Sequence, residues 1–311
     1  MNINIQEASY RDLPVYQLTC GEMTVCVAPS EGMNICHVQY GNYAIIEGNM
    51  ERRANGGTWG MPVLYPTPNR ISGGYAHFQG ATLPLFWKGK QLLMHGAARH
   101  MAFTVENTAV EADHAEITGY VDFVPGTESY NYFPYVSRLT LTVKVFENRV
   151  EVTHTVSNKD RKDLGFGYAY HPFFTKLGAT RIRTGAKSFY ITDENKLPSG
   201  ELATAEGVFD LSKPVDVDSL NLDHVYTDLP KGEDSCEIFY DEVGLHVTLK
   251  ATEDFSHLVV FTPKQPFFCL ENQTCSTDVH NLSATCDHTG LQVVKPGESV
   301  SGTVTIVAEK M

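Results

Sequence analysis

The chain has 311 residues, of which 42% are hydrophobic and 20% are charged, a composition typical of a folded globular protein and unlike that of a disordered one. Its 24 Lys and Arg residues against 37 Asp and Glu residues give a net charge of −13 without an offsetting basic run, which argues against a nucleic-acid partner. No apolar stretch approaches the ~18 residues of a membrane span, so we also expect no membrane association.

The N-terminal segment and the cysteines indicate a cellular compartment. Residues 1–16 lack the basic segment and apolar core of a signal peptide, so we expect none here. The seven cysteines are an odd number and include no CxxC pair. We therefore expect free, mostly buried thiols in a protein of the reducing cytoplasm.

Alternation of apolar and polar residues with period 2 predicts β-strands along the chain. In Leu139–Val145 every second residue is apolar, and the pattern resumes at Val150–Val156 after a turn at Glu147 and Asn148. These two segments are typical of a hairpin of half-buried strands. Further strands are predicted at Cys236–Tyr240, Leu245–Leu249 and Ser299–Val307, the first two forming a second hairpin around Asp241–Gly244 and the last following Lys295-Pro296-Gly297.

The pattern of the whole chain indicates one all-β domain. The 25 glycines and 15 prolines divide it into short segments, and no long segment has helical periodicity. We find no low-complexity linker and no obvious repeat. We therefore predict a single domain over residues 1–311, a large antiparallel β-sandwich or barrel with only short helices in its loops.

Several motifs of common enzyme classes are absent, among them GxSxG, GxxxxGK[ST], GxGxxG and HExxH. A zinc site is the one metal alternative, because cysteines and histidines gather near the C-terminus. Their spacing is wider than the C-x2-4-C of structural zinc sites, so we expect buried thiols, no metal and no cofactor. The residues concerned are Cys269, Cys275, His280, Cys286 and His288.

Four short stretches contain side chains suited to chemistry. Arg70 lies beside two prolines in a loop, where its planar guanidinium can grip hydroxyls or a carboxylate. His95 precedes a glycine, and His171 lies among aromatic residues with Pro172 imposing an extended backbone. Glu271 ends an apolar run, so its carboxyl is paired, protonated or functional. Taken singly, each also fits an ordinary loop arginine, a core imidazole or a structural ion pair.

Together and in this order, these stretches resemble the aldose 1-epimerase (galactose mutarotase-like) family. The resemblance spans about Thr58 to Val307, and it implies a β-supersandwich, in agreement with the strand pattern. The matching pieces are Asn69–Ile71 with Gly74 and Phe78, His95-Gly96, His171-Pro172-Phe173-Phe174, Asn221–Tyr226, Glu271 within Cys269–Thr274, and Lys295–Glu298.

The resemblance also implies an activity and a role for each residue. The family interconverts the α and β anomers of a free aldose by opening the sugar ring, without a metal or redox cofactor. Glu271 matches the general base and His171 the general acid. The remaining matches are substrate-binding groups: Arg70, His95, Asp223 and Asn69.

Three other functions remain open. A hexose-6-phosphate 1-epimerase would need basic groups at the pocket rim, for which Arg99 and Lys88 or Lys90 are the candidates, although the net charge fits a neutral sugar better. A non-catalytic sugar-binding or regulatory protein would need no acid and base. A glycoside hydrolase would need two carboxylates, and only Glu271 and Asp223 are available.

Three departures from the family pattern concern the identity of the sugar. Asn272 follows Glu271 where proline is common. Residues 87–91 lack the asparagines of galactose-specific members, and Ala97 and Ala98 are small where larger residues are usual. The sequence therefore predicts the reaction type and leaves the sugar and the oligomeric state undetermined.

Overall fold

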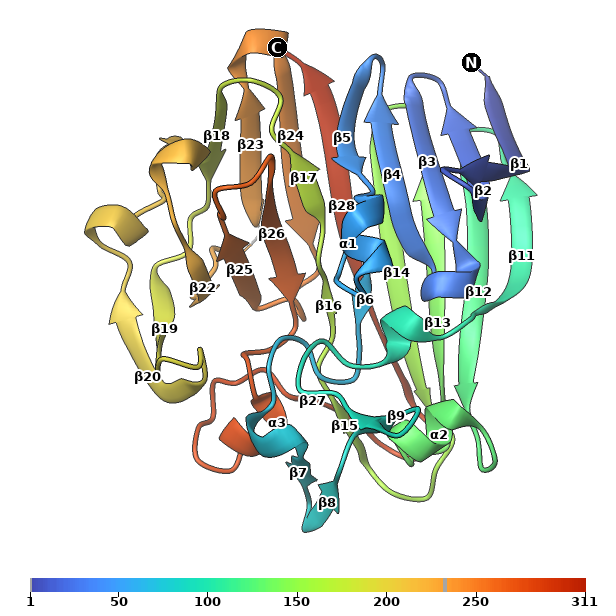
Figure 1. Ribbon diagram of the computed structural model, residues 1–311, viewed down its shortest axis with the longest axis vertical. Coiled ribbons are helices and arrows are strands. Elements are labelled where there is room, and N and C mark those ends of the chain that lie inside the picture. Colours follow the sequence, from blue (N-terminus) through green and yellow to red (C-terminus); the bar gives the residue numbers. More distant parts are fainter. Residues whose placement is uncertain (1, 232–233) are drawn as a thin grey trace.

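Two large antiparallel sheets build the computed structural model, which describes residues 2–231 and 234–311. Within these residues the first sheet has 13 strands and the second has nine. The first sheet crosses the molecule from β1 at the right of Figure 1 to β20 at the left, with β26 and β25 in its middle. The prediction of an all-β fold is confirmed.

The first sheet joins the N-terminal strands to strands from the second half of the chain. Two short strands, β16 (Ala169–Tyr170) and β6 (Val63–Leu64), extend it beside β26. In order across the sheet its other strands are β1 (Ile3–Tyr10), β2 (Leu13–Cys20), β3 (Met23–Ala28), β4 (Asn34–Tyr40), β5 (Tyr43–Glu47), β17 (Phe173–Thr175), β26 (Phe267–Gln273), β25 (His257–Phe261), β22 (Asp223–Thr227), β19 (Ser188–Thr192) and β20 (Pro198–Thr204).

The second sheet contains every strand predicted above. In order its strands are β11 (Thr104–Val110), β12 (Ala115–Phe123), β13 (Ser137–Val145), β14 (Arg149–Asn158), β28 (Ser299–Lys310), β24 (Leu245–Ala251), β23 (Cys236–Tyr240), β18 (Thr180–Arg183) and β21 (Val215–Asp216). Both predicted hairpins are confirmed, as β13–β14 and β23–β24. The last strand runs three residues beyond its predicted end, because Lys310 still pairs with Leu245 of β24.

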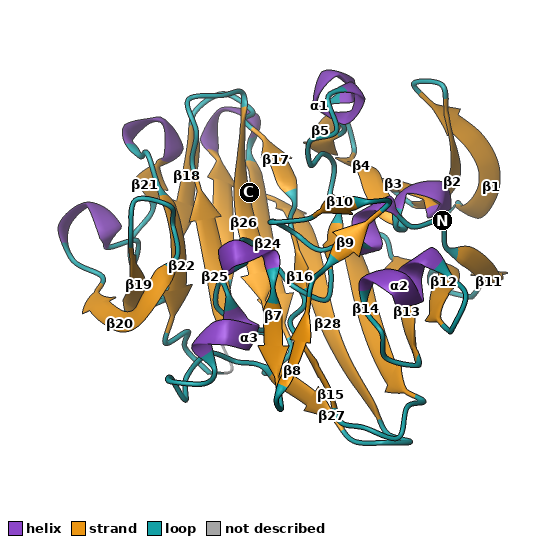
Figure 2. Ribbon diagram, turned by 60° about the horizontal axis from the view of Figure 1, so that its bottom comes forward, coloured by secondary structure: helices purple, strands orange, loops and turns teal. Residues whose placement is uncertain are grey.

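The remaining elements are small. Figure 2 shows the helices as short coils in the connections between strands. In the described residues the α-helices are α1 (Met50–Ala54), α2 (Glu128–Tyr132) and α3 (Val279–Leu282). The two-stranded ribbons are β7 (Ala76–Phe78) with β8 (Ala81–Leu83), β9 (Phe86–Trp87) with β10 (Lys90–Gln91), and β15 (Leu164–Phe166) with β27 (Gln292–Val294). None of the helices in the described residues has the length and apolar character needed to span a bilayer.

Strand alternation decides which side chains fill the space between the sheets. In β13 every second residue is buried, in line with its period-2 sequence. On the first sheet Tyr170, Phe268 and Leu270 belong to the main core cluster together with Leu141 and other residues of the second sheet. The residues between them on the same strands therefore project from the opposite face of the first sheet.

Candidate active site

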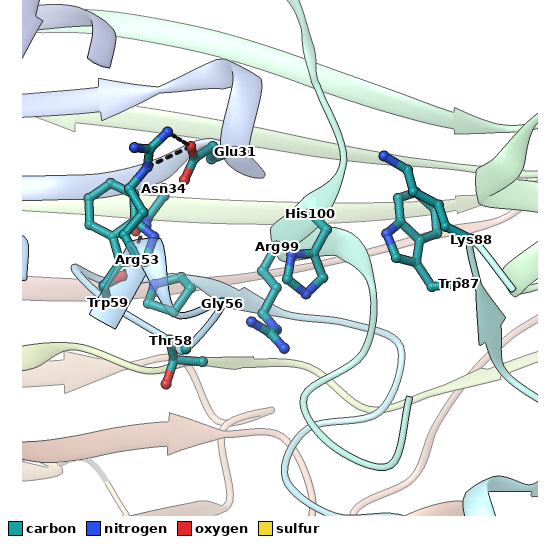
Figure 3. A pocket seen from close by; sticks show the side chains of 12 residues that line it. Glu31, Asn34, Arg53, Gly56, Thr58, Trp59, Trp87, Lys88, Arg99 and His100 are labelled. Carbon is teal, nitrogen blue, oxygen red and sulfur yellow. Dashed lines mark hydrogen bonds and ion pairs between the residues drawn. The ribbon is translucent and has the colours of Figure 1, made fainter. Parts of the chain in front are cut away.

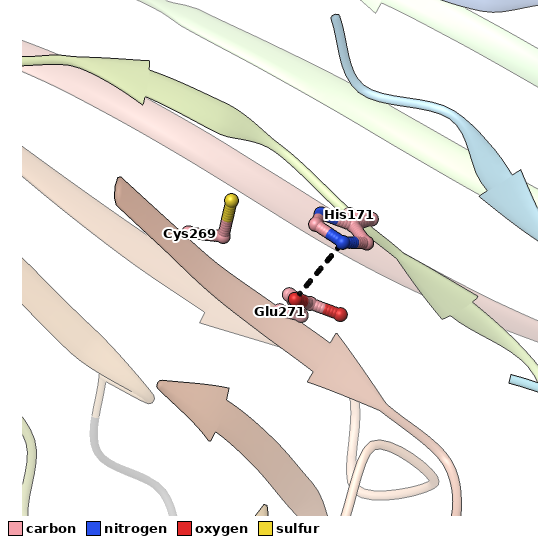
Figure 4. A group of neighbouring side chains, drawn as sticks. All are labelled: His171, Cys269 and Glu271. Atoms are coloured by element: carbon pink, nitrogen blue, oxygen red, sulfur yellow. Dashed lines mark ion pairs between the residues drawn. The ribbon is translucent and has the colours of Figure 1, made fainter. Parts of the chain in front are cut away.

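The strand register places His171 directly opposite Glu271. β26 pairs with β16 through Ala169 and Gln273 and with β17 through Phe173 and Cys269, so His171, midway between the two, faces Glu271. His171 Nε2 lies 3.3 Å from Glu271 Oε1, and both side chains are almost fully buried. Figure 4 shows the imidazole and the carboxyl group pointing toward each other from neighbouring strands.

Both side chains project away from the second sheet. Tyr170, next to His171, points the other way, since its hydroxyl donates a hydrogen bond of 3.3 Å to the carbonyl of Val152 on β14. The same alternation puts Cys269, Glu271 and Gln273 on one face of β26. The His171–Glu271 pair therefore stands on the outer face of the first sheet.

Asp223 reaches this face from β22, two strands away from β26. Val259 of β25 pairs with both Glu271 and Val225, and Asp223 precedes Val225 by two residues, so all these side chains share one face. The Asp223 carboxylate lies 3.5 Å from Arg70 Nη2, and each of these side chains is about 30% exposed. This ion pair forms the more open edge of the site.

The loop that carries Arg70 is held by its neighbours. Asn69 Oδ1 accepts hydrogen bonds of 3.0 Å from both the backbone N–H and Nη1 of Arg70. The backbone N–H of Asp278 donates to the carbonyl of Arg70 at 3.1 Å, and the Asp278 carboxylate accepts from the backbone N–H of Ser72. Asn69 thus orients the guanidinium, and Asp278 fixes the backbone of its loop.

His95 lies beside the pair on a tightly turned loop. Its backbone N–H donates to the carbonyl of Asn69 at 2.7 Å, and its ring meets that of His171 edge to face at 5.3 Å. Gly96 follows with φ of +62°, and a Cβ there would lie 2.2 Å from the carbonyl oxygen of Tyr65. Only glycine permits this approach of the loop to Tyr65.

One cavity of about 360 Å³ brings the predicted residues together. All six sequence-predicted residues line it, although they come from five separate segments of the chain. Its wall consists of Arg52, Gly56, Gly57, Thr58, Asn69, Arg70, Met94, His95, Arg99, His171, Asp223, Val259, Phe261 and Glu271.

Burial shifts the pKa values of the two facing groups, Glu271 and His171, in opposite directions. It raises the pKa of Glu271 well above its ordinary value, and the negative charge of Asp223 adds to this. Burial, reinforced by the positive charge of Arg52, lowers the pKa of His171 to about 3. Both shifts favour the uncharged forms, a protonated carboxyl group and a neutral imidazole, and the two groups in contact titrate as a coupled pair. Burial also lowers the pKa of His95, so that ring is neutral.

Three residues at this site were not among the six site residues predicted from the sequence. Gln273 Nε2 donates a hydrogen bond of 3.2 Å to Glu271 Oε2, and its spacing of two residues on one strand was the available signal. Arg52 comes from α1, in a segment without any motif. Arg99 appeared only as a candidate for binding phosphate.

The cysteine and histidine set near the C-terminus does not form one cluster, although Cys286 Sγ lies 3.2 Å from His288 Nε2. Among the described residues, only Cys269 of that set belongs to a close group of metal-ligand atoms, with His171 and Glu271 within 4.8 Å of one another. Burial raises the pKa of the Cys269 thiol well above its ordinary value, which keeps it protonated and a poor ligand. His280 is engaged elsewhere, on the carbonyl of Gly165.

Comparison with known proteins places this geometry in context. The sequence profile of the aldose 1-epimerase family matches residues 35–307. A galactose mutarotase-like protein from Clostridium acetobutylicum superposes with a TM-score of 0.89 at 21% identity, over 99% of each chain. A galactose 1-epimerase from Lactobacillus acidophilus gives 0.80 at 16% identity, again over 99% of each chain. At these identities the structural likeness establishes the fold, a galactose mutarotase-like sandwich.

Proposed function

The chain belongs to the aldose 1-epimerase family, and from this we propose that it interconverts the α and β anomers of an aldose, with Glu271 as base and His171 as acid. The observation that carries the proposal is the buried pair itself, an imidazole and a carboxyl group whose facing atoms lie 3.3 Å apart. We propose that the two groups share one proton. Proton exchange with both oxygens at C1 of a sugar needs one such acid and one such base.

In the active form of the pair the proton lies on His171. Glu271 removes the proton of the C1 hydroxyl while His171 Nε2 donates its proton to the ring oxygen, and the bond between C1 and the ring oxygen breaks. The open aldehyde rotates about the C1–C2 bond. Reclosure reverses both transfers on the other face of C1, so the pair returns to its starting state and no proton is consumed.

The remaining residues hold the sugar. Arg70 offers donors and Asp223 offers acceptors for hydroxyl groups at the open edge of the cavity. Neutral His95 and Asn69 complete the wall beside the pair. A role in sugar binding alone is less well supported, because binding does not require a buried acid–base pair. A glycosidase is also less well supported, because Asp223, its second carboxylate, is paired with Arg70.

We also propose that the protein works in the cytoplasm. Six cysteines in the described segments form no disulfide, and five of these are buried: Cys26, Cys36, Cys236, Cys269 and Cys275, with Cys286 partly exposed. A reducing compartment keeps such thiols unpaired.

The test is anomer exchange measured by NMR on a panel of aldoses. Glu271→Gln keeps the shape but cannot accept a proton, and His171→Asn keeps some hydrogen bonding but cannot deliver one. We expect each change to lower kcat by at least about a hundredfold, since loss of general acid or base catalysis costs 10²–10⁴-fold. The double variant is expected to be only slightly slower than either single one, because the two groups act as a unit.

Two controls make this test decisive. Near-ultraviolet circular dichroism and melting temperature are expected to show that both variants remain folded. Near-native turnover by Glu271→Gln on the best sugar of the panel contradicts the mechanism, whatever the fold.

A further inference from the structure

Two arginines on the wall of the active-site cavity lack a carboxylate partner. Arg70 pairs with Asp223, and Arg53 nearby pairs with Glu31 through Nε at 2.8 Å. Within the described residues, neither Arg52 nor Arg99 forms an ion pair, although 37 acidic residues give the chain its net charge of −13. Among the described residues, the Arg52 guanidinium donates one hydrogen bond, from Nε to the carbonyl of Thr58 at 2.9 Å.

Of the two arginines, Arg99 has the less satisfied guanidinium. Its Nε atom is buried and has no hydrogen-bond partner among the described residues. A buried guanidinium donor without an acceptor is costly, and a ligand that supplies the acceptor removes this cost. The planar guanidinium fits carboxylate and phosphoryl oxygens in particular.

A second cavity of about 330 Å³ adjoins the first one beside Arg99. Gly56, Gly57, Thr58 and Arg99 line both cavities, so Arg99 stands where they join. In the view of Figure 3, Arg99 lies between the paired Arg53 and Glu31 on one side and Lys88 with Trp87 on the other. Lys88 adds a further cation to this wall, whereas Lys90 lines neither cavity.

The unpaired arginines lie on the His171 side of the acid–base pair. The Arg52 guanidinium stacks 5.0 Å from the centre of the Phe173 ring, and that ring stacks on His171 at 4.6 Å. The positive charges of Arg52 and Arg99 help to lower the pKa of His171. The charges that influence the pKa of Glu271 are those of Asp223, which raises it, and Arg70, which lowers it. The site thus has unpaired positive charge near His171, whereas the charges near Glu271 balance each other in the Arg70–Asp223 ion pair.

This asymmetry orients the sugar. His171 faces the ring oxygen, which is bonded to C5, and C5 carries the C6 substituent of a hexose. Glu271 faces the C1 hydroxyl on the other side. A hexose bound productively therefore directs its C6 group toward Arg52, Arg99 and the second cavity.

We propose that Arg52 and Arg99 bind an anionic group on C6 of the aldose, either a phosphoryl group or a carboxylate, at the junction of the two cavities. The proposal rests on the function proposed above, because the orientation of the sugar follows from the roles of His171 and Glu271. It makes a charged hexose the preferred substrate class.

The test compares neutral and anionic sugars at constant ionic strength. D-Glucose, D-glucose 6-phosphate and D-glucuronate form one series, and D-galactose, D-galactose 6-phosphate and D-galacturonate form the other. We expect kcat/KM for anomer exchange to be at least tenfold higher for an anionic member than for its neutral parent. The two anionic members of each series distinguish a phosphoryl group from a carboxylate.

Substitutions test whether Arg52 and Arg99 cause the preference for anionic sugars. Arg99→Met and Arg52→Met are each expected to lower the ratio of anionic to neutral kcat/KM at least fivefold, and Arg99→Lys to lower it less. Lys90→Met removes an exposed cation outside both cavities and is expected to leave the ratio unchanged. A wild-type preference for the neutral parents, or a ratio that Arg99→Met does not change, overturns the proposal.

Calorimetric titration with the same sugars separates the two proposals. If neutral sugars exchange rapidly but anionic ones bind no more tightly, the anion site is wrong and the mutarotase function stands. If anionic sugars bind at least tenfold more tightly and this is lost in Arg99→Met, while no sugar of either series exchanges faster, the anion site stands and the proposed function fails.

Discussion

At the scale of single residues, the proposed chemistry depends on burying two titratable groups in contact. Exposed, Glu271 is a carboxylate and His171 is largely neutral at pH 7. Burial raises the pKa of Glu271 and lowers the pKa of His171, and their facing atoms lie 3.3 Å apart, which supports the proposal that the two groups share one proton.

The shared proton predicts a broad, bell-shaped dependence of kcat on pH. The lowered pKa of His171 means that the pair takes up a second proton only well below 6.5, the ordinary value for histidine. The raised pKa of Glu271 means that the pair releases its one proton only well above 4.5, the ordinary value for glutamate. We therefore expect a plateau through neutrality with a fall at both ends, measured as kcat from pH 4 to 10. A rate that rises steadily with pH across this range is incompatible with a one-proton pair.

Gln273 is predicted to tune the base. Its hydrogen bond stabilises the charged form of Glu271, so its loss raises the pKa of that carboxyl further. We expect Gln273→Leu to lower kcat about tenfold at pH 7 with little change in KM, and to move the alkaline limb to higher pH, because a hydrogen bond to a charged group contributes about 1.5–3 kcal/mol.

Asn272 provides the matched control for Gln273. It is equally buried on the same strand but points to the other face, and its side-chain amide has no hydrogen-bond partner among the described residues. Asn272→Leu is expected to keep the wild-type pH profile. A shift of the profile in both variants indicates a general effect on β26 and removes the specific role of Gln273.

At the scale of elements, the site depends on loops as much as on strands. β26 supplies Glu271, the junction of β16 and β17 supplies His171, and two loops held against each other supply Arg70 and His95. The contact between these loops is close, since Ala98 N donates to the carbonyl of Tyr65 at 3.3 Å and Gly96 packs on the same group.

Gly96→Ala is expected to displace His95. The new Cβ would lie 2.2 Å from the carbonyl oxygen of Tyr65 in a backbone with φ of +62°, so the loop must move. We expect kcat/KM to fall at least tenfold and the melting temperature to drop. Gly80→Ala is the control, since it shares the positive φ (+80°) but has open space around it. Equal losses of kcat/KM in the two variants would assign the effect to backbone strain alone.

At the scale of the whole molecule, the two sheets share one core. The main cluster of buried apolar side chains draws on strands of both sheets, from Leu18 in β2 to Ile306 in β28. We propose on this basis that residues 1–311 form a single domain. A single unfolding transition in urea, the same by fluorescence and by circular dichroism, is the expected result.

Buried histidines predict that this fold loses stability in mild acid. Burial lowers the pKa of His154 to about 3 and those of His257 and His280 to about 4. Between pH 6.5 and 4 the unfolded chain binds protons that the folded chain does not, so the free energy of unfolding falls as the pH falls. One pKa unit corresponds to about 1.4 kcal/mol, so each histidine costs about 3 kcal/mol by pH 4.

Urea unfolding at several pH values measures this slope. His154→Phe preserves an aromatic ring stacked on Tyr168 and is expected to make the slope shallower. His77→Gln changes an exposed histidine and is expected to leave it unaltered. A wild-type protein equally stable at pH 7 and pH 5 disproves the assignment of these histidines as neutral.

The sequence by itself determined five strands of the second sheet and six residues that line one cavity. Period-2 alternation is a local property, so β13, β14, β23 and β24 were predictable within two residues, and the ordered motifs pointed to the family. The distances were not predictable, because the contact of His171 with Glu271 depends on the register of strands a hundred residues apart.

Only the tertiary structure decided what surrounds those residues. Burial is a property of the assembled sandwich, and it is burial that raises the pKa of Glu271 and lowers the pKa of His171. The same holds for Arg52 and Arg99: the sequence shows two cations in an acidic chain, whereas the fold places both on one cavity wall without carboxylate partners. Long-range packing fixes these relations, and no local pattern in the chain encodes them.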